Sequence, residues 1–374
     1  MTSNLDITIV GWYGTETIGD RAILAGIIRI FCEVSSNIAI HLGSLYPVLT
    51  DRTLHDDGCF FEHCARQSQL HIELFDSQSQ HQLEHAIRHS EALVVGGGPL
   101  MDIAQMYMVE YAISYARRKK IKTIVLGCGY GPLVQTETIE SANRIINFAD
   151  LSITRDNNAP FATLSNQIDP AAFACMEFLN IHSEQKTNDY YAVNLREITP
   201  TDSHYHISSN TEERLTCFLK DILNTSDKHV RLVPMHTFSI GGDDRIILNR
   251  IAQKINSSRI EVITFPPSLE GTMEIYYNAC LCIGMRFHSV LMQTLLNGNN
   301  LILDYTHPQK GKIIGFMRQM DLIELCQDRY FSLCQASANI QLLLDDLKPL
   351  PINRRIIEQS FSSYVNLITD TLNQ

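Results

Sequence analysis

Short apolar runs alternate along the chain with stretches in which apolar residues recur at helical spacing. An unbroken apolar run bounded by glycine or polar residues predicts a buried strand, and a helical period predicts a helix that packs on it. Strands that alternate with helices in this way are typical of βα units and a parallel sheet. The predicted strands are Asp6–Val10, Ala92–Val95, Thr123–Leu126, Leu151–Ile153, Tyr190–Leu195, His229–Val233, Ile260–Phe265, Leu281–Met285 and Leu301–Leu303.

The pattern is interrupted at the polar segment His182 to Asp189 and then starts again. A chain of 374 residues is also longer than a single hydrophobic core usually grows. We therefore predict an α/β fold with two facing Rossmann-like, doubly wound domains, residues 1–181 and 182–345, and a ligand site in an interdomain cleft. The last segment, 346–374, holds a predicted helix from Arg354 to Leu372 that would pack back on the first domain.

The segment from His41 to His89 is more polar and holds seven histidines. Cys59, His63 and Cys64 cluster within it, but their spacing matches no zinc-binding pattern. We predict surface helices and loops for this segment and no metal site.

Composition narrows the class of protein further. The chain is 45% apolar and 19% charged, which is typical of a soluble globular protein. A net charge of −11 argues against nucleic acid as the main partner and against an electrostatic anchor to an anionic membrane. The ten cysteines are scattered without a Cys-x-x-Cys pair, and no signal-like or membrane-spanning run is present. We expect a cytoplasmic protein.

Three predicted strands of the first domain end in glycine-rich loops. Glycine lets the backbone approach a ligand closely, although tight βα turns need it for conformational reasons alone. The acidic residues behind the loops have the plainer alternative of capping the following helices. No loop carries the G-x-G-x-x-G fingerprint, which argues against a dinucleotide site. The loops and their acidic residues are Gly11–Gly19 with Asp20, Gly96–Pro99 with Asp102, and Gly127–Gly131.

Cations and histidines gather instead at strand ends of the second domain, at Arg196, His236, Arg286 and His288. Ligands of an open α/β sheet bind beyond the carboxyl ends of its strands, so these side chains would meet at one edge. Ser289 is predicted to cap the helix that follows. The alternative is a structural salt bridge for Arg286 and a core position for His288.

These motifs occur in an order and at spacings that resemble one family, the polysaccharide pyruvyl transferases, over about Ile7 to Leu322. No single motif is specific to that family, and the resemblance lies in their combination. The matching residues are Gly19, Asp20, Ala22 and Ile23; Gly96–Gly98, Leu100 and Asp102; Gly127, Gly129, Gly131, Pro132 and Leu133; Arg155 and Asp156; Asp169 and Pro170; Arg196; Met285–His288; and Tyr305, Lys312, Gly315 and Phe316.

Three positions depart from the family pattern. Thr17 stands where the family usually has asparagine, and Phe287 replaces a leucine. Extra residues at 306–311 leave both Lys310 and Lys312 as matches for the family lysine.

The resemblance implies an enzyme that attaches pyruvate from phosphoenolpyruvate to sugar hydroxyls as a ketal, in two GT-B-like domains. Arg196, Arg286 and Lys312 would bind the anionic donor, since arginine forks meet carboxylate and phosphate oxygens in pairs. His288 would also contact the donor and protonate its methylene carbon. No metal or other cofactor is implied.

The acceptor side follows from the same resemblance. Asp20, Gly97, Gly98, Asp102 and Gly129 would face a glycan of surface polysaccharide biosynthesis. Asp20, Asp102 and a second catalytic candidate, His236, are all open as the base that accepts the hydroxyl proton.

The sequence leaves the acceptor's carrier open. A lipid-linked, nucleotide-linked or free glycan fits equally, and a lipid-linked one would bring the protein to the inner face of the membrane in a peripheral contact. The acceptor sugar, the hydroxyls that form the ketal and their stereochemistry, and the oligomeric state are not determined either.

Two other functions compete with pyruvyl transfer, because fold does not fix function. A GT-B-type nucleotide-sugar glycosyltransferase could use Glu270 and Glu274, which we interpret instead as an exposed helix face. A non-catalytic carbohydrate-binding relative would have no need of a proton donor at His288.

Overall fold

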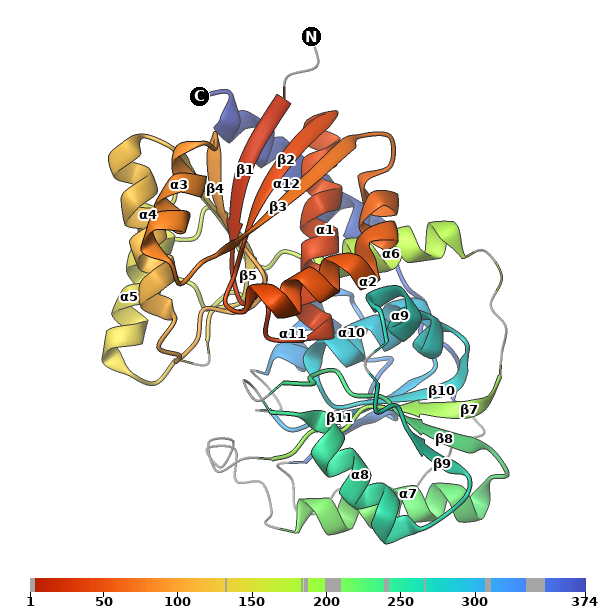
Figure 1. Cartoon of the computed structure of the whole chain (residues 1–374). Coiled ribbons are helices and arrows are strands. Elements are labelled where there is room, and N and C mark those ends of the chain that lie inside the picture. Colours follow the sequence, from red (N-terminus) through yellow and green to blue (C-terminus); the bar gives the residue numbers. More distant parts are fainter. Residues whose placement is uncertain are drawn as a thin grey trace. The chain divides into compact units, whose positions relative to one another are not determined.

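The computed structural model describes residues 4–131, 133–182, 184, 188–198, 210–238, 242–265, 267–306, 311–333 and 347–374. The chain forms two compact units (Figure 1). The first contains Met1–Glu177 and Arg354–Gln374, and the second contains Phe178–Asn353.

The first unit is built on a parallel six-stranded sheet in the order β3-β2-β1-β4-β5-β6. Its core includes Leu93, Val95, Val109, Ile113 and Ile145, all buried where the sheet meets its helices. The strands are β1 (Asn4–Val10), β2 (Asn37–Ser44), β3 (Gln69–Asp76), β4 (Ala92–Val95), β5 (Lys122–Cys128) and β6 (Leu151–Thr154). The helices are α1 (Ile18–Val34), α2 (Pro47–Ala65), α3 (Gln80–Arg88), α4 (Met106–Lys119), α5 (Thr136–Phe148), α6 (Ala171–Ile181), which reaches into the second unit, and α12 (Arg354–Leu372).

The second unit repeats this strand order, as β12-β11-β10-β7-β8-β9, and all its strand pairs are parallel. The strands are β7 (Asn188–Val193), β8 (His229–Leu232), β9 (Ile260–Val262), β10 (Ala279–Gly284), β11 (Asn300–Asp304) and β12 (Tyr330–Ser332). The helices are α7 (Thr211–Thr225), α8 (Asp244–Ile255), α9 (Leu269–Tyr277), α10 (Phe287–Leu296) and α11 (Lys312–Gln319).

Both sheets therefore have the doubly wound Rossmann order, which confirms the predicted fold class. In such a sheet the chain reverses its direction of winding between two central strands, and ligands bind at that switch point. The switch point lies between β1 and β4 in the first unit and between β7 and β10 in the second.

The helices predicted between His41 and His89 are present as α2 and α3, but the strands in this segment were missed. The segment contains the second half of β2 and all of β3. β3 is the edge strand of its sheet, and all but one of its residues are at least partly exposed. Its exposed and partly buried residues alternate, so only one face is covered and the strand lacks the unbroken apolar run by which the buried strands were identified.

The helix that follows the second glycine loop, α4, does not begin until Met106. The residues before it form a loop in which Leu100 pairs with Tyr130 of the neighbouring loop. The apolar residues of this loop extend the core without helical geometry.

The C-terminal helix α12 belongs to the first unit. Its Tyr364 is fully buried and donates a hydrogen bond to the carbonyl of Ile168 at 3.1 Å. Phe361 packs edge to face against Phe173. None of the described helices is both long enough and apolar enough to cross a bilayer.

Candidate functional site

Two glycine loops flank the switch point of the first unit, one after β1 and one after β4. Gly97 and Gly98 have φ of 93° and 115°, a region in which only glycine is comfortable. A Cβ on Gly98 would lie 2.5 Å from the Trp12 ring and 3.2 Å from Asp20 Oδ1. The predicted residues Gly98 and Asp20 are therefore brought into contact, and the close approach of the two loops requires glycine.

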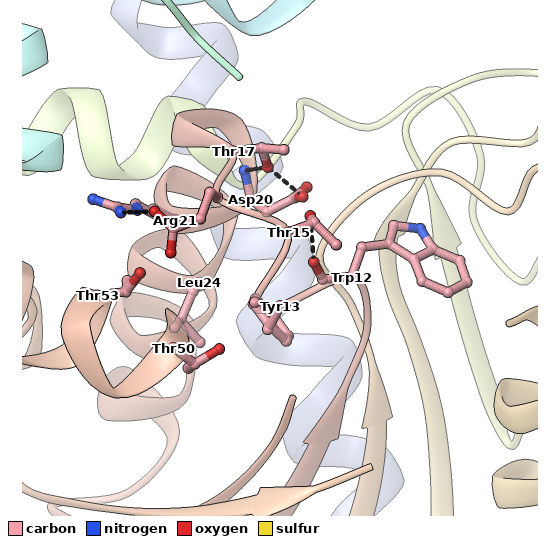
Figure 2. Close-up of a pocket in the computed structure, with 11 residues that line it drawn as sticks. Trp12, Tyr13, Thr15, Thr17, Asp20, Arg21, Leu24, Thr50 and Thr53 are labelled. Atoms are coloured by element: carbon pink, nitrogen blue, oxygen red, sulfur yellow. Dashed lines mark hydrogen bonds and ion pairs between the residues drawn. The ribbon is translucent and has the colours of Figure 1, made fainter. Parts of the chain in front are cut away.

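The cap of α1 is Thr17 and not Asp20. The Asp20 amide donates to Thr17 Oγ1 at 3.3 Å, and the Thr17 hydroxyl donates in turn to the Asp20 carboxylate (Figure 2). The threonine that departs from the family pattern thus has a structural role. Asp20 lies in the first turn, where the helix dipole favours its charge.

Burial nevertheless raises the pKa of Asp20 to about 7. The hydrogen bond from Thr17 and the charge of Arg155 lower that pKa, and the charge of Asp169 raises it again. Asp20 as a whole residue is only partly buried, but burial of its carboxyl group is the largest cause of the raised pKa. A carboxyl group that titrates near neutrality can accept or release a proton under physiological conditions.

Gly129 makes room for the buried guanidinium of Arg155. A Cβ at Gly129 would lie 2.8 Å from Arg155 Nε. Arg155 follows β6 and forms a buried ion pair with Asp169. This ion pair joins the loop after β6 to the loop before α6. Gly129 leaves the space that the Arg155 guanidinium occupies.

Asp102 is placed differently from the other predicted acceptor residues. Its carboxylate accepts from the Val134 amide at 2.6 Å and from the Thr138 hydroxyl. Asp102 therefore stabilises the start of α5. The alternative that it caps the helix after its own loop was wrong, because the N-cap of α4 is Gln105. Pro132, in the same region, lies outside the described residues.

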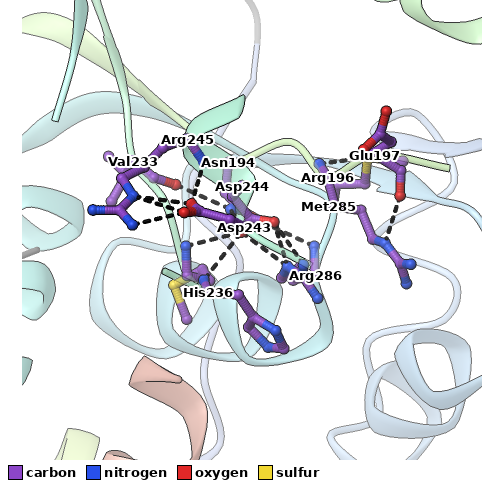
Figure 3. Close-up of polar contacts among 11 residues, drawn as sticks. Asn194, Arg196, Glu197, Val233, His236, Asp243, Asp244, Arg245, Met285 and Arg286 are labelled. Atoms are coloured by element: carbon purple, nitrogen blue, oxygen red, sulfur yellow. Dashed lines mark hydrogen bonds and ion pairs between the residues drawn. The ribbon is translucent and has the colours of Figure 1, made fainter. Parts of the chain in front are cut away.

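Asp244 organises the switch point of the second unit. Its carboxylate accepts from Arg286 Nε at 2.9 Å and from Nη2 at 2.6 Å (Figure 3). The backbone amides of Met235 and His236 donate to Asp244 Oδ2 at 3.0 and 3.1 Å. Arg286 is only 9% exposed. The salt bridge considered as an alternative for Arg286 is therefore present, and it fixes the plane of the guanidinium.

Asn194 ties the same strand ends together. Its side chain accepts from the Arg286 amide at 3.0 Å and donates to the Val233 carbonyl at 3.0 Å. The ends of β7, β8 and β10 are thereby locked in register. Neither Asn194 nor Asp244 was predicted: Asn194 is a polar residue inside a predicted strand, and Asp244 begins α8.

Arg196 follows β7, the strand that pairs with β10, and is partly exposed. Its guanidinium lies over the Tyr305 ring, 4.5 Å from the centroid, and its Nε donates to the Glu197 carbonyl. Its backbone amide contacts the Met285 sulfur at 3.4 Å. The two predicted arginines thus start from neighbouring strand ends, but Arg286 is paired with a carboxylate and Arg196 is stacked on an aromatic ring.

His288 is the second residue of α10 and is partly exposed, with its ring 5.0 Å from that of Phe287. The N-cap of α10 is Arg286, whose side chain makes no capping bond. Ser289 lies inside the helix and accepts from Gln293, so the predicted cap was wrong. Lys312 begins α11, and Lys310 lies outside the described residues.

His236 follows β8 and is partly exposed, with its amide bound to Asp244. Within the described ranges, no group of three or more His, Cys, Asp or Glu side chains could hold a metal ion.

Comparison with known proteins finds a matching family and solved structures of similar fold. The family model described as polysaccharide pyruvyl transferase matches residues 18–307. A search of curated protein sequences gives no match.

Solved structures of similar fold include two UDP-GlcNAc 2-epimerases. The Neisseria meningitidis epimerase bound to UDP-GlcNAc is 9% identical, with a TM-score of 0.54 over 99% of both chains. The Methanocaldococcus jannaschii epimerase, in complex with UDP-GlcNAc and UDP, is 12% identical, with a TM-score of 0.50 over 97% of this chain and 93% of that one. Similarity at this level of identity shows the fold alone.

Proposed function

We propose that this chain, which belongs to the polysaccharide pyruvyl transferase family, transfers pyruvate from phosphoenolpyruvate to two hydroxyls of a sugar to form a cyclic ketal. The observation that carries the proposal is the family match together with Arg196 and Arg286 at the switch point of the second unit. Ligand sites of doubly wound sheets lie at this position.

Phosphoenolpyruvate carries a carboxylate and a phosphate on a three-carbon skeleton, so its site must supply several positive groups. Arg196, Arg286 and Lys312 are the proposed cations. The amino end of α10 adds the partial positive charge of a helix N-terminus next to Arg286. Asp244 offsets one charge but holds the Arg286 fork in a fixed orientation, which favours bidentate recognition of an oxyanion.

His288 is the proposed general acid. Its imidazolium donates a proton to the methylene carbon, which becomes a methyl group, and the central carbon becomes electrophilic. A sugar hydroxyl then bonds to that carbon and loses its proton to a base. The bond to the phosphate oxygen breaks, phosphate departs with its electron pair, and a second hydroxyl closes the ketal and releases another proton.

The acceptor sugar is proposed to bind at the glycine loops of the first unit, near Asp20, Gly97 and Gly98. Gly129 supports these loops through Arg155. Asp102, whose oxygens already hold Val134 and Thr138, contributes loop geometry. Asp20 and His236 stand as candidates for the base, and the acceptor's carrier, lipid or nucleotide, is not specified by these contacts.

Thermal unfolding with added ligands tests the donor. Phosphoenolpyruvate should raise the melting temperature of the wild type, whereas UDP-sugars should not. Stabilisation by UDP-sugars alone would instead indicate a nucleotide-sugar glycosyltransferase. Phosphate release from phosphoenolpyruvate with a panel of glycans then tests transfer, and binding of glycans without release of phosphate would leave a non-catalytic carbohydrate-binding protein.

A further inference from the structure

The amino-terminal edge of the first sheet carries a cluster of positive charge that pyruvyl transfer does not use. The cluster, called here the α4 basic cluster, consists of Arg117, Arg118 and Lys119 in the last turn of α4, Lys120 as its C-cap, and Lys122 at the start of β5. The first four residues are exposed, and Lys122 is partly exposed. No Asp or Glu occurs between Glu110 and Glu137, so no neighbour in sequence offsets these charges.

The cations of the α4 basic cluster have no acidic partners in the described part of the chain. None of the five forms an ion pair, whereas Arg144 on the adjacent helix α5 pairs with a carboxylate of α4. Arg117 donates to the Phe148 carbonyl at 3.2 Å, and Arg118 lies over the Tyr115 ring, 5.7 Å from its centroid. These contacts orient the side chains but do not neutralise them. Like charges placed together repel one another, and the fold supplies no counter-charge.

The helix dipole explains only part of the cluster. Cations in the last turn of a helix interact favourably with its dipole, and the effect fades beyond that turn. Lys122 lies past the helix, and the neighbouring α3 adds Arg88 in its own last turn. Carboxylates at this edge include Glu91, next to Lys122, and Asp150, which already accepts from the Thr123 amide and hydroxyl. The edge therefore keeps an excess of positive charge.

The cluster and the glycine loops lie at opposite edges of the first sheet. The helices α3 and α4 end just before β4 and β5, two parallel strands that pair side by side (Figure 1). The cluster is therefore at the amino ends of these strands, and the glycine loops follow their carboxyl ends. α4 has 14 residues and spans about 21 Å between the two edges. A partner bound at the cluster would leave the glycine loops accessible.

The composition of the cluster distinguishes between the kinds of anionic partner. Protein interfaces have an apolar core in which lysine is rare, but no described residue from Met108 to Leu133 is a large exposed apolar one. Single-stranded nucleic acid needs aromatic rings on which its bases stack, and Tyr115 is buried beneath the cations. An anionic bilayer needs neither feature, because its headgroups attract clustered Lys and Arg side chains by charge alone.

We propose that the α4 basic cluster docks the protein on an anionic lipid bilayer. The net charge of −11 argued against such a contact when the chain was taken as a whole. At physiological salt, however, charges more than about 8 Å away are largely screened, so the local charge decides. The contact is electrostatic and reversible, and it does not depend on the proposed pyruvyl transfer.

Co-sedimentation with phosphatidylcholine vesicles that contain or lack phosphatidylglycerol tests the proposal. The wild type should bind the anionic vesicles and not the neutral ones. The triple variant Arg118→Gln, Lys119→Gln, Lys120→Gln should bind about 10²-fold more weakly, at about fivefold per cation. Raising the salt from about 0.1 M to about 1 M shortens the Debye length from about 10 Å to about 3 Å and should release the wild type.

A matched control removes three cations from the second unit. Lys228, Arg250 and Lys254 all pair with carboxylates, and their replacement by glutamine changes the net charge by the same amount. This variant should keep vesicle binding. Equal losses in the two triple variants, or equal binding to neutral and anionic vesicles, would overturn the proposal. Thermal unfolding checks that the variants fold, and Arg118→Gln alone, with its fivefold loss, replaces a triple variant that does not.

Two further measurements separate a membrane from other sources of phosphate. Inorganic phosphate should release the wild type from vesicles no better than sodium chloride of equal ionic strength. Release by phosphate at lower ionic strength would instead indicate a site for a single phosphate ion. Duplex DNA, titrated by fluorescence anisotropy, should bind more weakly than anionic vesicles at equal phosphate concentration, and tighter binding would make the cluster a nucleic-acid site.

Discussion

The two units share one strand order but end their central strands in opposite ways. In the first unit the chain leaves β4 through Gly97 and Gly98, and the backbone and its neighbours shape the surface. In the second unit β7 and β10 are followed by Arg196 and Arg286, whose side chains shape the surface there. The same topological feature can therefore present either bare backbone or charged side chains.

The buried charges also have different functions in the two units. Arg155 and Asp169 lie behind the glycine loops as a closed pair. Asp244 instead pairs with an arginine that ends a strand, and its second oxygen accepts two backbone amides. The first pair supports the backbone of the loops, whereas the second fixes the orientation of the Arg286 guanidinium.

The largest effect should come from His288→Ala, which removes the proposed acid. We expect kcat to fall by about 10²–10⁴-fold, with affinity for phosphoenolpyruvate largely kept, in steady-state phosphate release and calorimetric titration. His182→Ala is the control, since that histidine of the second unit pairs with Glu270 at 3.0 Å. Wild-type turnover in His288→Ala would refute the assignment of His288 as the general acid. The second unit would then lack the proton donor that is proposed to distinguish it from the first.

Arg286→Ala should lower the free energy of unfolding by about 3–5 kcal/mol, because it leaves the Asp244 carboxylate buried and unpaired. Arg245→Ala tests a neighbouring ion pair with Asp243 that is partly exposed, and should cost only about 0–1 kcal/mol. Urea unfolding measures both. Equal losses in the two variants would mean that Asp244 does not anchor the strand ends.

Gly98→Ala tests the surface that the glycine backbone after β4 forms in the first unit. A methyl group at φ 115° and 2.5 Å from the Trp12 ring should cost about 1–3 kcal/mol of stability. Gly58→Ala is the control, because nothing lies within 4 Å of its added carbon inside α2, and there alanine should stabilise by about 0.5–1 kcal/mol. Thermal unfolding that ranks the two variants in reverse would contradict the close approach of the loops.

Arg196→Lys should give the smallest effect, about a tenfold loss of phosphoenolpyruvate affinity, since lysine keeps the charge but not the planar fork. Arg231→Lys is matched to it, as another arginine over a tyrosine ring of the second unit, 4.2 Å from the Tyr190 centroid. Calorimetric titration with phosphoenolpyruvate should separate the two variants. Identical affinities would place the donor away from the end of β7.

The fold was predictable because buried strands of a parallel sheet need unbroken apolar runs. β4, β5, β10 and β11 were all recognised in this way. β3 was missed because an edge strand buries little of its surface and carries no such run.

The candidate site was predictable only in part. Position after a predicted strand was enough to single out Arg286, and position behind a glycine loop singled out Asp20. Their partners were not: Asp244 is 42 residues from Arg286 in the chain, and no local pattern links the two.

The sequence by itself determined the doubly wound class, the places where strands give way to loops, and which residue types stand there. These properties follow from local periodicity and from the freedom of glycine. Only the tertiary structure decided which charges are neutralised and which carboxyl titrates near pH 7. Those outcomes depend on desolvation and on neighbours from distant segments, which exist only once the chain has folded.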